Sequence, residues 1–230
     1  MADQVLGIFA KQPIAGRVKT RLCPPLSPQQ AAELYRTCLQ ETVLAMADAP
    51  AERVLFFDGD GIFFAETFPD LRLIPQSDGD LGRRLDRAFA QLFAEGCSAV
   101  ALIGSDSPDL PMPLVADAFT ALNNHDLTVA PARDGGYVLI GQSVHSPELF
   151  CDMPWSSADL WPATRQQGEE LGLSCRELDG WEDLDDLASL QRLCQRSPAS
   201  PTAQLARRIL ASCSALSSGI QSVAPEQQGS

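Results

Sequence analysis

The chain has 230 residues, 45% of them hydrophobic, and a formal net charge of −13. This length and hydrophobic share suffice for one sizeable α/β core. The acidic excess argues against a broad nucleic-acid or anionic-membrane surface, because both need a basic face. Since the chain also lacks an apolar run of about 18 residues, we expect no membrane span.

The cysteines and the N-terminus point to the cytoplasm. Seven cysteines are scattered without a C-x-x-C pair, which favours reduced thiols over a disulfide framework or a zinc site. The first ten residues, MADQVLGIFA, have no cationic n-region and resemble a first strand rather than a secretory signal. We therefore expect a cytoplasmic protein.

Strands and helices are expected to alternate along most of the chain. Ser27 at the N-cap and Pro28 at the first helical position predict a helix start, and Gly96 predicts a helix stop. The expected strands are 5–10, 53–57, 100–103, 127–130, 137–140 and 173–178. The expected helices begin at Pro28 and near Pro111, or span 81–95, 158–171 and 185–194. Such alternation predicts a single α/β domain with a mixed, mostly parallel sheet flanked by helices.

The composition changes near residue 197. The following tail is rich in Ser, Gln, Ala and Pro, with one plausible helix at 202–213. We therefore expect a domain at 1–196 and a partly helical extension at 197–230 whose end is weakly ordered.

Residues 99–111, AVALIGSDSPDLP, form an apolar strand that stops at Gly104 and is followed by Asp106 and Asp109. Ligands of open α/β sheets bind beyond the carboxyl ends of the strands. A carboxylate there can hold a divalent cation against phosphate oxygens. Alternatively, Ser105 or Asp106 only caps a turn before the next helix.

A basic loop follows the first strand. Residues 11–22, KQPIAGRVKTRL, concentrate four basic side chains in an otherwise acidic protein and include the turn glycine Gly16: Lys11, Arg17, Lys19 and Arg21. Such a loop can cradle a pyrophosphate, although the spacing is not that of a P-loop. The alternative is a solvated basic surface loop. The basic loop and the acidic turn together suit a nucleoside diphosphate, whose charge cations and a metal can share.

Six motifs in order now resemble a known family: the basic loop, QSDGDLGRRL from Gln76, GSDSPDLP from Gly104, ARDGGYVLIG from Ala132, PWSS from Pro154 and DLD at 183–185. Over about residues 5–193 the chain resembles the nucleotide-diphospho-sugar transferase superfamily with the GT-A fold, in its branch of uncharacterised bacterial glycosyltransferase-like proteins. The first acidic turn lacks a strict D-x-D, so we expect Asp106 alone to serve there.

The resemblance implies a role for each motif. Phosphates and nucleotide would contact the basic loop and Gln76, Gly79, Asp80 and Gly82. Mg²⁺ or Mn²⁺ would bind Asp106 with Asp183 or Asp185. The acceptor side would include Gly135, Gly136, Tyr137 and Trp155, with Asp134 as a candidate catalytic base. Structural alternatives remain: Asp185 or Asp80 as a helix cap, the glycine pair as a hairpin turn, and Trp155 as core.

The implied activity is metal-dependent transfer from a nucleotide-activated donor to an unidentified small-molecule acceptor, with a homodimer left open. Glycosyl transfer from a nucleotide-diphospho-sugar is the main interpretation, and nucleotidyl transfer from an NTP to a phosphorylated acceptor is its alternative. A third interpretation is a phosphatase: in the segment VLFFDGDGI, Asp58 and Asp60 resemble the nucleophile motif of haloacid-dehalogenase-type phosphatases. A non-catalytic binding scaffold is the fourth.

Overall fold

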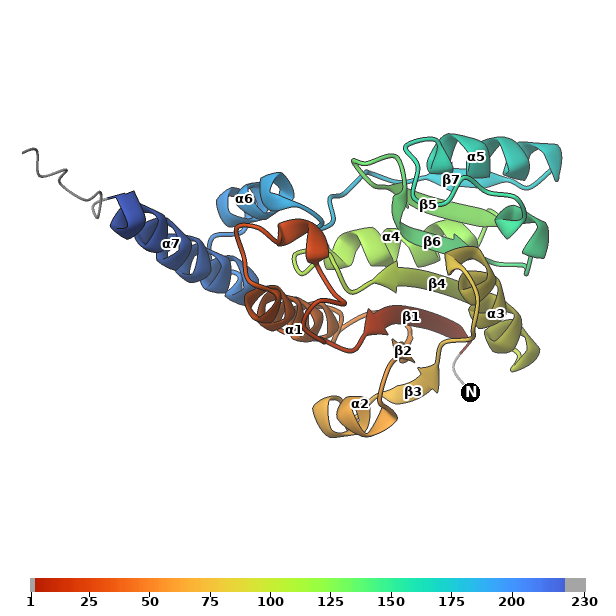
Figure 1. Ribbon diagram of the computed structural model, residues 1–230. Helices are drawn as coiled ribbons and strands as arrows, with labels where there is room; N and C mark the ends of the chain where they lie inside the picture. Colours follow the sequence, from red (N-terminus) through yellow and green to blue (C-terminus); the bar gives the residue numbers. More distant parts are fainter. Residues whose placement is uncertain (1–2, 222–230) are drawn as a thin grey trace, which may run out of the picture. The chain divides into compact units, whose positions relative to one another are not determined.

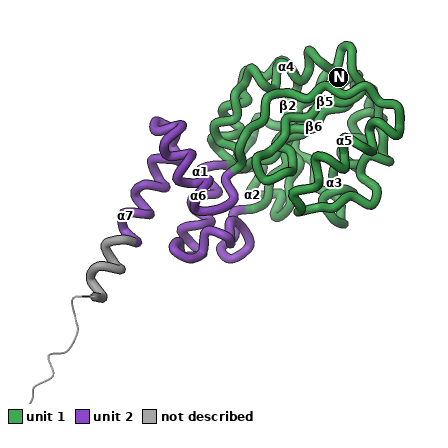
Figure 2. The backbone as a smooth tube through the Cα atoms, turned by 90° about the horizontal axis from the view of Figure 1, so that it is seen from above, with its two compact units in different colours: residues 1–12, 39–183 green, residues 13–38, 184–230 purple. Residues whose placement is uncertain are grey.

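The computed structural model describes residues 3–221, and the side chains of residues 3–213. The chain divides into two compact units, each built from two stretches of sequence (Figure 2). The first unit comprises Met1–Gln12 and Leu39–Asp183, and the second comprises Pro13–Cys38 and Leu184–Ser230. The boundary predicted at residues 196 and 197 remains a prediction, and residues 222–230 of the expected weakly ordered end lie outside the described part.

The first unit is built on a seven-stranded sheet with the order β3-β2-β1-β4-β6-β5-β7 (Figure 1). Only β6 runs antiparallel to its neighbours among these strands. The predicted mixed, mostly parallel sheet is therefore confirmed. The strands are β1 (Gln4–Lys11), β2 (Glu52–Asp58), β3 (Arg72–Pro75), β4 (Ala99–Gly104), β5 (Leu127–Pro131), β6 (Tyr137–Gln142) and β7 (Cys175–Glu177).

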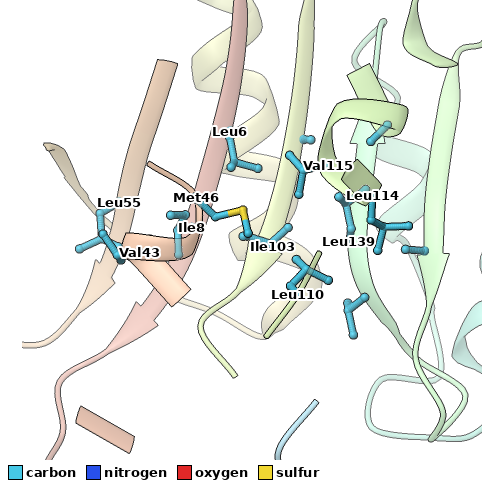
Figure 3. Close-up of a cluster of buried hydrophobic side chains, with 14 of the residues drawn as sticks. Leu6, Ile8, Val43, Met46, Leu55, Ile103, Leu110, Leu114, Val115 and Leu139 are labelled. Carbon is cyan, nitrogen blue, oxygen red and sulfur yellow. The ribbon is translucent and has the colours of Figure 1, made fainter. Parts of the chain in front are cut away.

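Helices cover both faces of this sheet. One face packs against α2 (Gly61–Thr67), α4 (Met112–Leu122) and the C-terminal part of α1 (Pro28–Ala45). Figure 3 shows this cluster, in which Met46 of the segment after α1 meets Ile8 of β1 and Ile103 of β4. The other face packs against α3 (Leu81–Ala94), the short helix η2 (Pro147–Phe150) and α5 (Leu160–Glu170). Because both faces are buried, the strands read as continuous apolar runs.

The second unit is helical. Apolar side chains of η1 (Thr20–Leu22), the N-terminal part of α1, α6 (Leu187–Arg196) and α7 (Pro201–Gln221) form one separate cluster. The predicted cap of α1 is confirmed, since the Ser27 hydroxyl accepts a hydrogen bond from the Gln30 amide at 3.2 Å. The helix expected at 202–213 is longer, and its apolar side chains between residues 203 and 213 belong to the core of this unit.

One α-helix and one strand were not expected from the sequence, α2 and β3, and neither were the short helices η1 and η2. The N-cap of one helix also differs from the expectation. Asp186, and not Asp185, caps α6, with its carboxylate accepting from the Ser189 amide at 2.7 Å in a capping box. At the end of α3, Glu95 is the C-cap and Gly96 follows with a φ of 93°, so the predicted helix stop is confirmed.

Candidate active site

The carboxyl edge of the sheet gathers the polar residues that the sequence singled out in the first unit. Lys11, the last residue of β1, lies opposite Asp58, the last residue of β2. On the other side of β1, Phe9 is paired with Gly104, where β4 ends. Asp106 follows β4 by two residues, as Lys11 follows Phe9 by two. A cation and a carboxylate therefore leave adjacent parallel strands at the same edge.

The two carboxylates of the acidic turn have different surroundings. Asp109 accepts a hydrogen bond from the Trp181 indole at 3.3 Å, so it helps to hold the segment after β7. Asp106 is half-buried between Ser105 and Ser107, which are buried. The N-cap of α4 is Pro111, so Asp106 is not the cap of that helix. The functional role of Asp106 stays a prediction.

Two more carboxylates meet at the ends of β5 and β7. An isolated bridge pairs Ala132 with Trp181, and two residues beyond this bridge on either segment stand Asp134 and Asp183. One carboxylate oxygen of Asp134 lies within 4.8 Å of one of Asp183. Oxygen ligands at this spacing suit a hard divalent cation such as Mg²⁺ or Mn²⁺. This pair therefore fits a divalent cation, but it joins Asp183 to Asp134, and the group of neighbouring acids does not include Asp106.

Asp185 belongs to the second unit, where two basic-loop side chains hold it. Lys19 Nζ lies 3.2 Å from Asp185 Oδ1 and also donates to the Leu184 carbonyl. Arg21 Nη1 lies 3.4 Å from Asp185 Oδ2. The two cations differ in exposure, because the Lys19 side chain is 6% exposed and the Arg21 side chain 70%. Lys19 is thus a buried partner of the DLD motif, whereas Arg21 faces solvent.

Backbone geometry shapes the rest of the basic loop. Gly16 has a φ of 78° and open space around its Cα, and the neighbouring Arg17 is exposed. Lys19 itself has a φ of 49°, a left-handed conformation that costs a non-glycine residue about 1 kcal/mol. Its ammonium also lies 6.0 Å from the centroid of the Tyr35 ring. Burial, an ion pair and this ring contact together hold Lys19 in that conformation.

The loop of residues 76–80 starts with a glutamine that is fully engaged. The Gln76 amide donates to the Ala10 carbonyl at 3.1 Å and to the Phe56 carbonyl at 2.9 Å. Its oxygen accepts from Arg84 at 3.1 Å. At the end of the loop, Asp80 caps α3 by accepting from the Arg83 amide at 2.9 Å. The capping alternative for Asp80 is therefore observed, and a direct nucleotide contact for Gln76 and Asp80 stays a prediction.

Two of the predicted site glycines have close packing partners. A Cβ on Gly82 would lie 2.5 Å from the Trp155 ring, and a Cβ on Gly135 would lie 2.1 Å from the Ala158 carbonyl oxygen. Gly135 also has a φ of 93°. Both positions therefore require glycine for packing. Gly79, with a φ of 116°, requires it for its backbone conformation.

The aromatic residues of the expected acceptor side lie against the core. Trp155 is partly buried and its ring stacks near Phe150, with centroids 6.5 Å apart. Tyr137 packs against the same apolar cluster. Burial raises the pKa of its hydroxyl, and a hydrogen bond with Thr164 offsets only part of this rise. Tyr137 is therefore a poor candidate for a proton acceptor near neutral pH. The Gly135–Gly136 pair forms the turn of the predicted β5–β6 hairpin, in which Gly136 donates to Asp134 at 3.0 Å.

Sequence reasoning missed Arg84. It forms an ion pair with Asp58 at 2.8 Å and bonds to two groups of the 76–80 loop. The double arginine in QSDGDLGRRL was a signal, but helix periodicity alone does not tell which arginine points back toward the strands. Asp60, the other acid of the DGD segment, caps α2 by accepting from the Ile62 amide at 2.9 Å. The phosphatase motif is thus a strand end and a helix cap.

This fold, with acids and a lysine at the carboxyl edge of its sheet, is that of the nucleotide-diphospho-sugar transferases. A candidate nucleotide-diphospho-sugar transferase from Desulfovibrio desulfuricans G20 is 33% identical, with a TM-score of 0.85 over 93% of this chain and 97% of that chain. The family model described as "Uncharacterized protein conserved in bacteria (DUF2064)" matches residues 39–157. The chain belongs to this bacterial family.

More distant structures share the fold. A CMP:2-keto-3-deoxy-manno-octonic acid synthetase in complex with CTP is 11% identical, with a TM-score of 0.55 over 86% of this chain and 99% of that chain. Rv0371c of Mycobacterium tuberculosis H37Rv in complex with manganese is 16% identical, with a TM-score of 0.51 over 84% and 98%. Curated proteins yield no match. Among residues 3–221, none of the helices has the length and apolar character that crossing a bilayer requires.

Proposed function

We propose that this protein is a metal-dependent transferase that binds a nucleotide-activated donor, in the main case a nucleotide-diphospho-sugar, at the carboxyl edge of the sheet. The observation that carries the proposal is the shared edge of β1 and β4, where Lys11 and Asp106 leave neighbouring strands. A lysine and a metal-binding carboxylate side by side suit the phosphates of such a donor. The coarser statement, a nucleotide-using transferase, rests on the family and on its fold.

The basic side chains are assigned to the phosphates. Lys11 contributes its charge from the end of β1, and Arg17 and Arg21 are exposed cations of the loop that follows. Arginine pairs well with phosphate because its planar guanidinium can donate two parallel hydrogen bonds. When the donor bond breaks, the same cations would stabilise the charge on the departing phosphate group.

Asp106 and Asp183 are the proposed metal ligands, and Asp185 is the third candidate because it follows Asp183 by two residues. Bound Mg²⁺ or Mn²⁺ would supply positive charge at the donor's phosphate oxygens. Among the fold's neighbours, the Rv0371c structure contains manganese, which supports this choice of cofactor. Lys19 and Arg21 orient the Asp185 carboxylate in the second unit, since they contact its two oxygens separately.

Asp134 is the proposed base that takes the proton from the acceptor hydroxyl if the transfer inverts the sugar's stereochemistry. It is exposed, so an acceptor can reach it, and the Gly136 amide orients its carboxylate. Because Asp134 also lies near Asp183, an Asp134→Asn variant should be assayed for turnover and for Mn²⁺ affinity separately. We expect turnover to fall at least about 100-fold, and by more than any loss of Mn²⁺ affinity accounts for. Undiminished turnover would remove Asp134 from this role.

Nucleotidyl transfer is the second candidate, favoured by the shared fold of the CTP-bound synthetase. The two reactions release different products. Glycosyl transfer from a nucleotide-diphospho-sugar releases a nucleoside diphosphate, whereas nucleotidyl transfer from an NTP releases pyrophosphate. The protein can be incubated with mixed NTPs or nucleotide sugars and a panel of phosphorylated and unphosphorylated acceptors. Assay of both products then distinguishes the two reactions. Pyrophosphate release alone would favour the second candidate.

The binding site itself is tested by titrating CTP, GTP, UTP, UDP-glucose and GDP-mannose with and without Mn²⁺. We expect at least one of them to bind in a Mn²⁺-dependent way, and Asp106→Asn to weaken that binding at least about tenfold through loss of a metal ligand. Asp117→Asn, on an exposed position of α4, makes the same charge change and should leave binding intact. Equal binding by wild type and Asp106→Asn would contradict the proposed site.

A further inference from the structure

The DGD segment and Arg84 form a structural connection that the proposed chemistry does not use. Asp58 ends β2, and Arg84 lies in the first turn of α3. Arg84 Nη1 lies 2.8 Å from Asp58 Oδ2, and the two side chains are 25% and 44% exposed. The pair joins the carboxyl edge of the sheet to the helix that follows the 76–80 loop. Lys11, a proposed phosphate ligand, is the register partner of Asp58.

Arg84 also holds the 76–80 loop at two points. Its Nη1 donates to the Gln76 side-chain oxygen at 3.1 Å, and its Nε donates to the Gly79 carbonyl at 3.0 Å. Gly79 has a φ of 116°, a backbone conformation that other residues rarely adopt. One guanidinium thus fixes the beginning and the middle of the loop, while Asp80 fixes its end by capping α3.

The loop is in turn attached to the neighbouring strands β1 and β2. Gln76 donates to the Ala10 and Phe56 carbonyls, and its backbone amide donates to the Phe57 carbonyl at 2.8 Å. These bonds use both amide hydrogens of the Gln76 side chain, and Arg84 uses its oxygen. Gln76 is therefore saturated by contacts within the protein, which suits a brace better than a ligand contact.

We propose that Arg84 is a positioning residue, held by Asp58, that keeps the 76–80 loop in the conformation in which it accepts the nucleotide. This inference rests on the proposed function for the ligand, and it moves Gln76 from the contact residues to the supporting ones. Arginine is required because the bonds use two different nitrogens of a rigid fork. Lysine at position 84 retains the charge but supplies only one nitrogen for the three partners.

The test compares five proteins: wild type, Arg84→Gln, Arg84→Lys, Asp58→Asn and Arg87→Gln. Arg87 is exposed on the same helix, so its replacement makes the same charge change away from the loop. Hydrogen–deuterium exchange of peptides that cover residues 76–84 reports loop order without any ligand. Titration with Mn²⁺ and the nucleotide that the wild type binds most tightly, among the five used above, reports the function of the loop.

We expect Arg84→Gln to speed exchange in residues 76–84 and to weaken nucleotide binding at least about tenfold, a loss in the range of one or two charged hydrogen bonds. Arg84→Lys should restore binding only in part, and Arg87→Gln should match the wild type in both measurements. If Arg84→Gln lost its fold in general, exchange would also become faster in peptides outside this loop. Asp58→Asn leaves Arg84 in place and is therefore a milder second variant. It should show faster exchange and weaker nucleotide binding, both to a smaller extent.

If the wild type binds a nucleotide and Arg84→Gln binds it equally well, the positioning role is overturned while the proposed function stays intact. Unchanged exchange in residues 76–84 would overturn it as well, since the brace would then not order the loop. The absence of nucleotide binding by the wild type, in contrast, would overturn the proposed function, and the positioning role for a nucleotide would fall with it.

Discussion

The contact between Gly82 and Trp155 makes a glycine necessary inside a helix. A Cβ at position 82 would come within 2.5 Å of the indole ring, whereas a Cβ on Gly168 of α5 would meet its nearest atom at 3.4 Å, an ordinary contact. Alanine is usually the better helix residue, by about 1 kcal/mol. The two glycines therefore differ in what an added methyl group does.

We expect Gly82→Ala to lower the free energy of unfolding by about 1–3 kcal/mol, because the clash outweighs the gain in helix propensity. Gly168→Ala should be neutral or stabilising by up to about 1 kcal/mol. Thermal and urea denaturation of both variants measure this difference. A Gly82→Ala protein as stable as Gly168→Ala would contradict the close packing of Trp155 against α3.

Lys19 and Arg21 hold the same carboxylate but differ in burial, so their removal should have different effects. Lys19→Met leaves Asp185 and the Leu184 carbonyl without a buried cation, and we expect a loss of about 1–3 kcal/mol in stability. Arg21→Met removes an exposed partner and should change stability by less than about 0.5 kcal/mol. If Arg21 contacts the phosphates, its variant still loses nucleotide affinity. Unfolding curves and nucleotide titrations of both variants test this difference between Lys19 and Arg21. A Lys19→Met protein as stable as the wild type would contradict the structural role of Lys19.

The roles of single residues were harder to predict from the sequence than the fold. The cap Ser27 and the stop Gly96 were predicted correctly, and Asp106 follows a strand end as expected, because caps, stops and strand ends follow local rules. The interpretation of Asp185 as the α6 cap was wrong, because the adjacent Asp186 satisfies the same local rule and caps the helix. Arg84 and Trp181 were missed because their partners, Asp58 and Asp109, are distant in the sequence.

At the scale of elements, a carboxylate and a serine next to β5 and β7 join these two strands at the edge of the sheet. Asp126, just before β5, accepts from the Ser174 hydroxyl at 2.6 Å and from the Ser174 amide at 2.8 Å. These two bonds favour the carboxylate and lower the pKa of Asp126 in the folded protein. The short strand β7 is therefore attached at its start by a charged group as well as by its ladder.

The lowered pKa gives the Asp126–Ser174 contact a defined pH dependence. Its stabilisation is present above the unfolded pKa of about 3.9 and is lost as the pH falls through the lower folded pKa. We expect Asp126→Asn to unfold about 1 kcal/mol more easily than wild type near pH 7, with the difference shrinking below about pH 4. Denaturation of both proteins between about pH 3 and 7 measures it. A difference that stays constant over this range would contradict the assignment.

Most strands and α-helices were predicted, and the two exceptions, α2 and β3, have a physical reason. The strands around residues 5–10 and 100–103 are buried on both faces, so their apolar runs were plain. α2 is seven residues long and Ile62 in its first turn is 68% exposed, so its pattern has little amphipathic contrast. β3 is four residues long and begins with an exposed arginine. Short elements provide too few residues for a period to be read.

For the whole molecule, the sequence established the fold class and not the grouping of its segments. The mixed α/β sheet was predicted from the alternation of strands and helices, and the family resemblance is confirmed. The second compact unit combines residues 13–38 with residues 184–230, which local patterns cannot associate because their contacts join distant parts of the chain. The basic loop and the DLD motif meet in that unit for the same reason.

The central claim is that carboxylates at the carboxyl edge of the sheet bind a divalent cation that contacts a nucleotide. Crystals grown with Mn²⁺ and the most tightly bound nucleotide, measured at the manganese absorption edge, test it most directly. We expect an anomalous peak within about 2.5 Å of carboxylate oxygens of Asp106 and Asp183, with nucleotide phosphate oxygens completing the coordination. Nucleotide density at another place on the molecule, or manganese bound away from both aspartates, would contradict the account.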